Sequence, residues 1–181
     1  MDQYREIERK FIIGLDKMSR FGIFESISKM PYMDITQGYL PSNDRQWVRL
    51  RQILYTMYDK RVVGEEYTWT IKGSGSVDRP ERETAIWKQQ FHVMWPLFED
   101  ISLHKHRYSL SSSGAKVLHL DIYKNGDSGI VTAEVEFDTL EQCDAYVPEE
   151  WFGLEVSKDP EWSNYSLALK RVQTLRKNRQ Q

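Results

Sequence analysis

The chain lacks several features that mark large classes of proteins. It has one cysteine, Cys143, among 181 residues, so neither an internal disulfide nor a cluster of thiolate metal ligands can form. No apolar run approaches the length of about 18 residues that a membrane-spanning helix needs. The N-terminal stretch has no apolar core of the kind found in secretory signals. We therefore expect a cytoplasmic protein with no membrane partner.

An excess of positive charge is also missing. The 25 lysine and arginine residues face 27 acidic residues, which gives a formal net charge of −2. A protein that binds nucleic acid through its phosphates should be clearly basic, so no nucleic-acid partner is expected. Hydrophobic residues make up 40% of the chain and aromatic residues 13%, enough for a sizeable core. Because we find no repeat, low-complexity tract or linker, we expect one domain over residues 1–181.

Strand-like segments dominate the chain. Stretches rich in β-branched and aromatic residues, bounded by turn residues, predict strands near 5–11, 33–40, 45–54, 65–73, 80–86, 103–110, 115–126 and 129–138. Helices are expected over 15–30, 87–98 and 139–146, and a basic helical tail begins at about residue 161. This arrangement predicts an α+β fold with an antiparallel sheet.

Charged residues in these strands recur with a period of two. In the stretch REIERKF, Glu6, Glu8 and Lys10 share one face of an extended chain, and Ile7 and Phe11 lie on the other. The same test finds pairs of like charge in later strands. The further acids are Glu81, Glu83, Asp121, Glu134 and Glu136, and the further bases are Arg49, Arg51, Lys72, Lys105 and Arg107.

Two interpretations of these pairs stay open. On an open sheet they would form a solvated, charged face. On the inner face of a closed barrel, the acids could hold a divalent cation such as Mg²⁺ or Mn²⁺, and the bases could bind phosphate oxygens through arginine forks. A ligand that satisfies both groups at once is a complex of a metal with a polyphosphate.

The charged segments also occur in a characteristic order. EIERKF is followed along the chain by TQGYL, VRLR, TIKGSG, RPERE, HKHRY, LDIY, AEVEF and SNYSLAL. This series resembles the CYTH domain, also called the triphosphate tunnel metalloenzymes, over nearly the whole chain. The resemblance implies a closed antiparallel eight-stranded β tunnel, or barrel, with a charged interior and with helices packed outside.

The resemblance further implies a role for each charged residue. The metal ligands would be Glu6, Glu8, Glu134 and Glu136, with Asp121 as an additional candidate. The phosphates would be bound by Lys10, Arg49, Arg51, Lys72, Lys105 and Arg107. Glu81 and Glu83 would place a second metal or the attacking water, and with Lys105 they form the expected catalytic set.

Members of this family differ in substrate. They hydrolyse inorganic triphosphate, thiamine triphosphate or RNA 5′-triphosphate ends, and some make cyclic AMP from ATP. The cyclase branch usually carries a His-Phe element before its acidic signature, and MDQYREIERKF lacks it. We therefore expect hydrolysis of inorganic triphosphate, a small-molecule substrate, with Mg²⁺ or Mn²⁺ as cofactor.

Several alternatives to this expectation stay open. They are a class IV-type adenylate cyclase, a thiamine or nucleoside triphosphatase, and a module that binds polyphosphate without turnover. A long hairpin over about residues 52–66 leaves the choice among inorganic and organic triphosphates open, and a homodimer is compatible with the sequence.

Two histidines lie outside this scheme. His104 and His106 are two residues apart, so they would share the face of their strand opposite Lys105 and Arg107. A transition-metal pair is one interpretation of this spacing, and an ordinary surface position is the favoured one.

Overall fold

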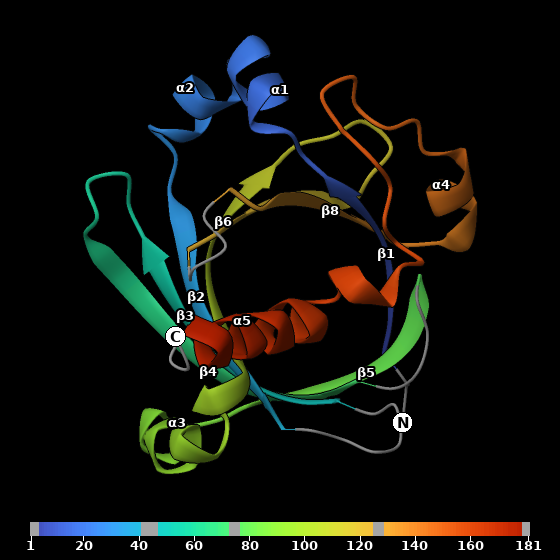
Figure 1. Ribbon diagram of the computed structural model, residues 1–181. Helices are drawn as coiled ribbons and strands as arrows, with labels where there is room; N and C mark the ends of the chain where they lie inside the picture. Colours follow the sequence, from blue (N-terminus) through green and yellow to red (C-terminus); the bar gives the residue numbers. More distant parts are fainter. Residues whose placement is uncertain (1–3, 41–46, 73–76, 125–128, 179–181) are drawn as a thin grey trace.

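The structure is a computed structural model that describes residues 4–40, 47–72, 77–124 and 129–178 (Figure 1). Its strands are β1 (Tyr4–Ile12), β2 (Tyr32–Leu40), β3 (Trp47–Thr56), β4 (Val62–Lys72), β5 (Asp78–Ala85), β6 (Ser102–Leu110), β7 (Val117–Tyr123) and β8 (Val131–Phe137). Its α-helices are α1 (Leu15–Arg20), α2 (Ile23–Ile27), α3 (Lys88–Met94), α4 (Leu140–Ala145) and α5 (Asn164–Asn178). Three short 3₁₀ helices are η1 (Trp95–Leu97), η2 (Glu99–Ile101) and η3 (Pro160–Trp162).

All eight strands belong to one antiparallel sheet. Hydrogen-bonded neighbours run in the order β1-β5-β4-β3-β2-β6-β7-β8, and β1 pairs with β8 as well as with β5. The sheet therefore curves around an interior, and each strand has an inner and an outer face (Figure 1). Lys10 lies opposite Glu134, and Arg107 lies opposite Asp121, so the charged pairs of the sequence share the inner face.

Apolar residues on the outer face form the main core. Leu118, Leu120, Val131, Ala133 and Val135 alternate with the charged positions of β7 and β8 and are fully or almost fully buried. Helices α1, α2 and α4 add further side chains to this cluster, namely Met18, Ile27 and Cys143. Burial of one large apolar side chain stabilises the fold by about 1.5–3 kcal/mol. The apolar outer face therefore supplies stabilisation that offsets the cost of burying charged side chains on the inner face.

The helix predicted over residues 15–30 is broken in two. Gly22 separates α1 from α2 and adopts a left-handed conformation with φ of 65°. Only glycine reaches this conformation without steric cost, so the chain turns at Gly22 instead of continuing the helix. The helix predicted over 87–98 ends at Met94, because Pro96 leads the chain into η1.

The predicted fold class needs correction. The prediction was a closed antiparallel eight-stranded β tunnel with helices packed outside, and the structure departs from it in two respects. First, the joint between β1 and β5 is short, because β1 pairs with β5 only over residues 4–7 and with β8 over residues 7–12. By comparison, β3 and β4 pair along almost their whole length. Among the described residues this joint is the shortest ladder of the sheet, with four residue pairs against five between β4 and β5.

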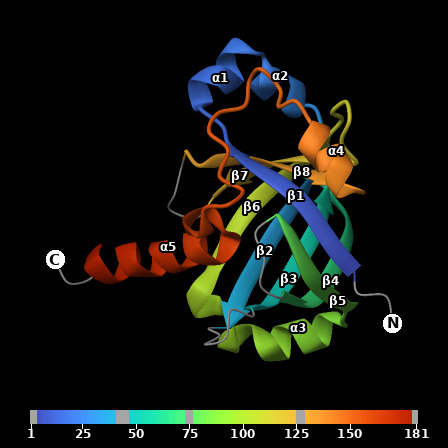
Figure 2. The ribbon, with the colours of Figure 1, turned by 90° about the vertical axis from the view of Figure 1, so that its right-hand side faces the viewer.

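Second, α5 does not pack on the outside. It lies across one end of the ring of strands in Figure 1 and projects from that end in Figure 2. Leu167 and Ala168 of α5 are buried against Tyr39, Leu103 and Tyr123, which point from β2, β6 and β7 toward the interior. The C-terminal helix thus covers one mouth of the predicted tunnel.

The predicted hairpin at about residues 52–66 is also present. β4 extends beyond its pairing with β5, which ends at Thr68, whereas β3 stays paired with β2 up to Thr56. The turn between β3 and β4 falls at residues 57–61, where the Met57 N–H donates to the Arg61 carbonyl over 2.9 Å. Within the described ranges, no helix has both the length and the apolar character needed to cross a bilayer.

Candidate active site

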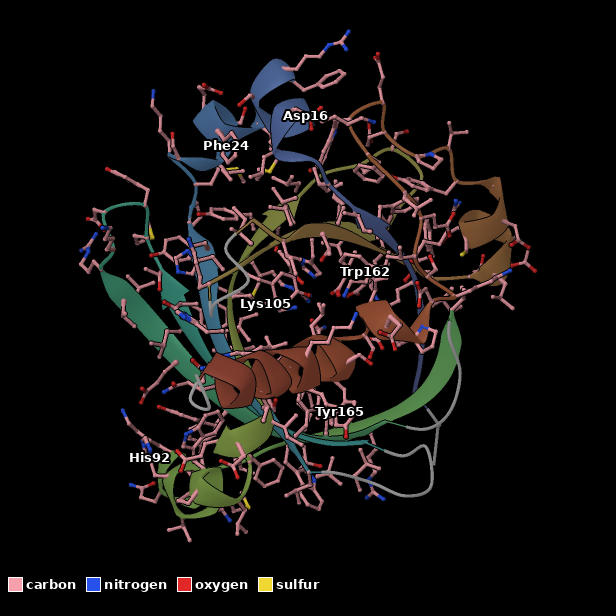
Figure 3. The ribbon with its side chains drawn as sticks, viewed as in Figure 1. Asp16, Phe24, His92, Lys105, Trp162 and Tyr165 are labelled. Atoms are coloured by element: carbon pink, nitrogen blue, oxygen red, sulfur yellow. The ribbon has the colours of Figure 1, made fainter. Side chains whose placement is uncertain are left out.

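The inner face of the sheet holds a network of ion pairs. Figure 3 shows Lys105 inside the ring of strands, with Tyr165 on the helix α5 that covers one end. Three groups of side chains make up this network, and each draws its members from neighbouring strands. A buried charge without a partner would cost several kcal/mol, so these pairings determine whether the sheet can carry the charges at all.

The first group centres on Asp121 of β7. Its carboxylate is fully buried and accepts hydrogen bonds from Arg107, with Nε–Oδ1 and Nη2–Oδ2 distances of 2.7 Å. The Nζ atom of Lys105 also donates to this carboxylate. Burial opposes the charge of Asp121, but Arg107 and Lys105 outweigh it and lower the pKa of Asp121. Asp121 thus fixes two cations side by side on β6.

Glu134 of β8 extends this group toward β1. Lys10 Nζ lies 3.0 Å from its Oε1 atom, and Arg107 donates to its Oε2 atom. Against the effect of burial, Lys10, Lys105 and Arg107 hold the pKa of Glu134 well below its ordinary value. Burial and the neighbouring Arg107 lower the pKa of Lys105 to about 8. Three cations and two carboxylates therefore share one buried region.

A second group lies on β3, β4 and β5. Arg49 and Arg51 both donate to Glu83, with Nη2–Oε2 distances of 2.9 Å in each case. The Thr70 hydroxyl donates to the same Oε2 atom over 2.7 Å. Burial raises the pKa of Glu83, but Arg51, Thr70 and Arg49 together lower it below the ordinary value. One carboxylate thus accepts hydrogen bonds from two arginines of the same strand.

One tyrosine connects the two groups. Burial raises the pKa of Tyr39 to about 12, whereas Arg49, Lys10 and Arg51 act on it in the opposite direction. A single buried phenol therefore lies within electrostatic reach of cations from β1 and from β3. The basic side chains of the two groups face one interior space.

The third group is acidic. Glu8 lies directly opposite Glu136 across the β1–β8 ladder. Burial raises the pKa of Glu136, and Glu6, Glu8 and Glu134 raise it further, although Arg107 opposes them. Mutual repulsion of this kind is what a divalent cation relieves, and carboxylate oxygens are the ligands that Mg²⁺ and Mn²⁺ prefer. The donor set present therefore fits such a cation.

Two of the residues expected in the site are described only in part. Lys72 and Glu81 pair with each other across β4 and β5, but their side chains lie outside the described part of the structure. The backbone places both at inner-face positions, next to Thr70 and Glu83 in the register.

Sequence reasoning missed two side chains of the site. The Tyr123 hydroxyl accepts a hydrogen bond from Lys10 over 3.4 Å and donates to Asn164 over 2.6 Å. Asn164 in turn donates to Glu134, with an Nδ2–Oε1 distance of 3.5 Å. Asn164 is the first residue of α5, so the helix that covers one end of the strands also contacts the charged network. The motif SNYSLAL contained this signal, but nothing local shows what the asparagine would touch.

The pairing of Asp121 predicts its effect on stability. Replacement of Asp121 by Asn should lower the free energy of unfolding by about 3–5 kcal/mol, because Lys105 and Arg107 would stay buried beside each other after the loss of one of the two carboxylates, Asp121 and Glu134, that compensate them. Chemical denaturation of both proteins measures the difference.

A matched control is Glu65→Gln, which removes a carboxylate from an exposed pair with Lys88. It should leave the unfolding midpoint unchanged, because solvent screens such pairs. Equal stability of Asp121→Asn and the parent protein would show that Asp121 is not the anion that compensates the two cations.

Comparisons by sequence and by structure both find triphosphatases similar to this chain. No family model matches the chain. An inorganic triphosphatase of Nitrosomonas europaea is 33% identical over 165 residues, which cover 91% of this chain and 97% of that protein. A crystal structure described as an inorganic triphosphatase is 30% identical, with a TM-score of 0.57 over 91% of this chain and 94% of that chain.

More distant structures share the fold. A protein of Pyrococcus horikoshii has a TM-score of 0.61 at 17% identity, over 94% of this chain and 99% of that chain. At that level of identity, the likeness concerns the arrangement of strands and helices.

Proposed function

The chain belongs to the CYTH family of triphosphate tunnel metalloenzymes, and from that membership and the ion-pair network we propose that it is an inorganic triphosphatase. The reaction is the hydrolysis of one phosphoanhydride bond of triphosphate, dependent on a divalent cation. The observation that carries the proposal is Glu83, whose carboxylate is held between Arg49 and Arg51. Because the 33% identical relative is described as an inorganic triphosphatase, a triphosphate is the anion that best fits this fork.

Arg49 and Arg51 would bind phosphate oxygens by exchange with Glu83. Each arginine already has its guanidinium directed at one carboxylate, so an incoming phosphate oxygen finds the donors oriented. The side chain of Glu83 is 33% exposed and can swing toward solvent as the phosphate enters. A charge-assisted hydrogen bond contributes about 1.5–3 kcal/mol.

Lys10, Lys105 and Arg107 would bind the other end of the triphosphate. In the structure, Asp121 and Glu134 compensate these cations and hold them in place. Binding of an anion would add to this network, and its negative charge would favour the protonated form of Lys105, whose pKa is about 8. Lys72, at the inner-face position opposite Glu81, is the remaining cation of the proposed set.

A divalent cation, Mg²⁺ or Mn²⁺, would be held by Glu6, Glu8, Glu134 and Glu136. When bound, it supplies Lewis-acid polarisation of the phosphoryl group and compensates the charge that develops on the leaving phosphate. Asp121 lies with its carboxylate already engaged by Lys105 and Arg107, so we assign it to the support of those cations.

Glu83, with Glu81, would orient the attacking water and accept its proton. Displacement from the arginine fork leaves the Glu83 carboxylate beside the bound phosphate. There the loss of Arg51 and Arg49 as partners would raise its pKa back toward the ordinary value of a glutamate. Exchange of Glu83 for a phosphate oxygen would thus bind the substrate and, in the same step, free the Glu83 carboxylate to accept a proton from water.

The single sheet indicates how many domains the chain has. We infer a single domain, because all eight strands join one sheet and α5 packs against its inner face. The substrate is a small molecule, and the proposal requires no second copy of the chain, although a homodimer is compatible with it.

Substrate preference tests the proposed function. The purified protein should release phosphate from triphosphate with a kcat/KM at least about tenfold above that for ATP, because the charged side chains that bind phosphate lie on the inner face and an adenosine group must find its contacts elsewhere. Phosphate release is measured for triphosphate, ATP, thiamine triphosphate and long polyphosphate under one buffer with Mg²⁺ or Mn²⁺, and excess chelator should abolish it.

Each rival activity has its own signature in that panel. Accumulation of cyclic AMP, or a kcat/KM for ATP equal to that for triphosphate, would replace the proposal by a cyclase or nucleotidase function. Tight binding of polyphosphate without release of phosphate would replace it by a binding module.

The proposed metal ligands give a second prediction. Glu136→Gln should remove most of the activity at a Mg²⁺ concentration that saturates the parent protein, because one anionic ligand is lost while its shape is kept. Its stability should be equal or higher, because repulsion by Glu6, Glu8 and Glu134 is relieved. Activity is followed across a Mg²⁺ titration and stability by thermal unfolding.

The control is Glu141→Gln on α4, an exposed acid outside the inner face. It should change neither quantity. Full activity of Glu136→Gln at low Mg²⁺ would remove Glu136 from the set of ligands.

A further inference from the structure

Three potential metal ligands meet on the outer face of the sheet, away from the candidate active site. They are Asp34 of β2 and the two histidines of β6, His104 and His106. His104 Nε2 lies 2.5 Å from Asp34 Oδ1, and His106 Nε2 lies 3.6 Å from Asp34 Oδ2. All three ligand atoms lie within 4.8 Å of one another.

Strand geometry explains why these side chains converge. His104 and His106 are two residues apart on β6, so both leave the same face of the strand. Asp34 lies directly opposite His106 in the β2–β6 ladder, and His104 is the next outer-face position on β6. The alternating residues Lys105 and Arg107 point to the inner face and belong to the site described above. The outer cluster is therefore built by the same strand from the opposite face.

The cluster is held in place by its surroundings. The Tyr32 ring packs against the His106 ring with a centroid distance of 4.5 Å, and Tyr32 also contacts Tyr108. The side chains keep 20–32% of their surface exposed, which leaves an ion and its water ligands a path from solvent.

We propose that Asp34, His104 and His106 form a binding site for a borderline transition-metal ion, of which Zn²⁺ is the model case. Two imidazoles and one carboxylate, with a water in the fourth position, are a common ligand set for zinc, whereas Mg²⁺ prefers oxygen ligands alone. Bonds of about 2.0–2.1 Å in a tetrahedron place ligand atoms roughly 3.3 Å apart. With one ligand atom from each residue, the three atoms already lie within 4.8 Å of one another, so each separation would change by at most about 1.5 Å.

Metal binding here would cross-link two neighbouring strands. Asp34 belongs to β2 and the histidines belong to β6, so the ion would link these two strands. Lys105 and Arg107 of the candidate active site lie on β6 as well. An ion that binds only the folded state raises the midpoint of thermal unfolding by mass action. The site requires no triphosphatase activity, so it can be tested independently of the proposed function.

Cobalt binding provides the test. Co²⁺ serves as a spectroscopic substitute for Zn²⁺, and a large excess of Mg²⁺ occupies the inner-face carboxylates during the titration. The full chain should bind one Co²⁺ with visible absorption bands of low-coordinate cobalt, and Zn²⁺ should displace it. His106→Ala should weaken Co²⁺ binding by at least about a hundredfold, since loss of even an outer-shell partner costs 10–100-fold.

Two other histidines supply controls. His92→Ala removes an exposed imidazole on α3, and His119→Ala removes one that lies 3.6 Å from Glu136 on the inner face. Both variants should bind Co²⁺ like the parent protein and show the same rise in unfolding temperature with Zn²⁺. Absence of binding by the parent protein, or unchanged binding by His106→Ala, would overturn the proposal. A loss of binding in His119→Ala alone would place the ion at the acidic group and would overturn it as well.

Discussion

The buried carboxylate of Asp121, held between Lys105 and Arg107, is the interaction on which the rest of the site depends. A β-sheet that curves around an interior normally fills it with apolar side chains, and this one carries charges there instead. Such charges are tolerated only when each has a partner of opposite sign. The apolar outer face, with Leu120 and Val135 at its centre, supplies the stability that the inner face does not.

The pairing of cations with carboxylates inside the sheet also explains how the site can bind a highly charged substrate. Cations that are already paired and oriented need little rearrangement when an anion arrives. The Glu83 side chain is 33% exposed, against 0% for Asp121 and 7% for Glu134, and its partners Arg49 and Arg51 lie on β3. Substrate and metal would therefore change partners within an existing network. In the acidic group, burial and the neighbouring Glu6, Glu8 and Glu134 raise the pKa of Glu136 in spite of Arg107, and a bound divalent cation would relieve this repulsion.

Which charged residues share the inner face could be predicted from the period of two along each strand. This period places Glu8 with Lys10, and Arg49 with Arg51, on one face. The period does not tell which strands are neighbours, so it could not bring Asp34 to His104 and His106, or Glu83 to the arginine fork. The helices were predicted to pack outside because the family resemblance implied it, and the tail was predicted to be a basic helix with a solvated face. Leu167 and Ala168 instead find their apolar partners at one end of the strands. Such contacts depend on tertiary structure, which no local pattern encodes.

The central claim is that the inner face binds a triphosphate through oriented arginines, and calorimetric titration with a non-hydrolysable triphosphate analogue in the presence of Mg²⁺ tests it most directly. The account predicts one binding site per chain and a loss of affinity of about tenfold to a hundredfold in Arg51→Ala, the value of one charge-assisted contact. Arg82→Ala, an exposed arginine at the neighbouring position to Glu83 on the other face of β5, should bind like the parent protein. An unchanged dissociation constant for Arg51→Ala would contradict the account.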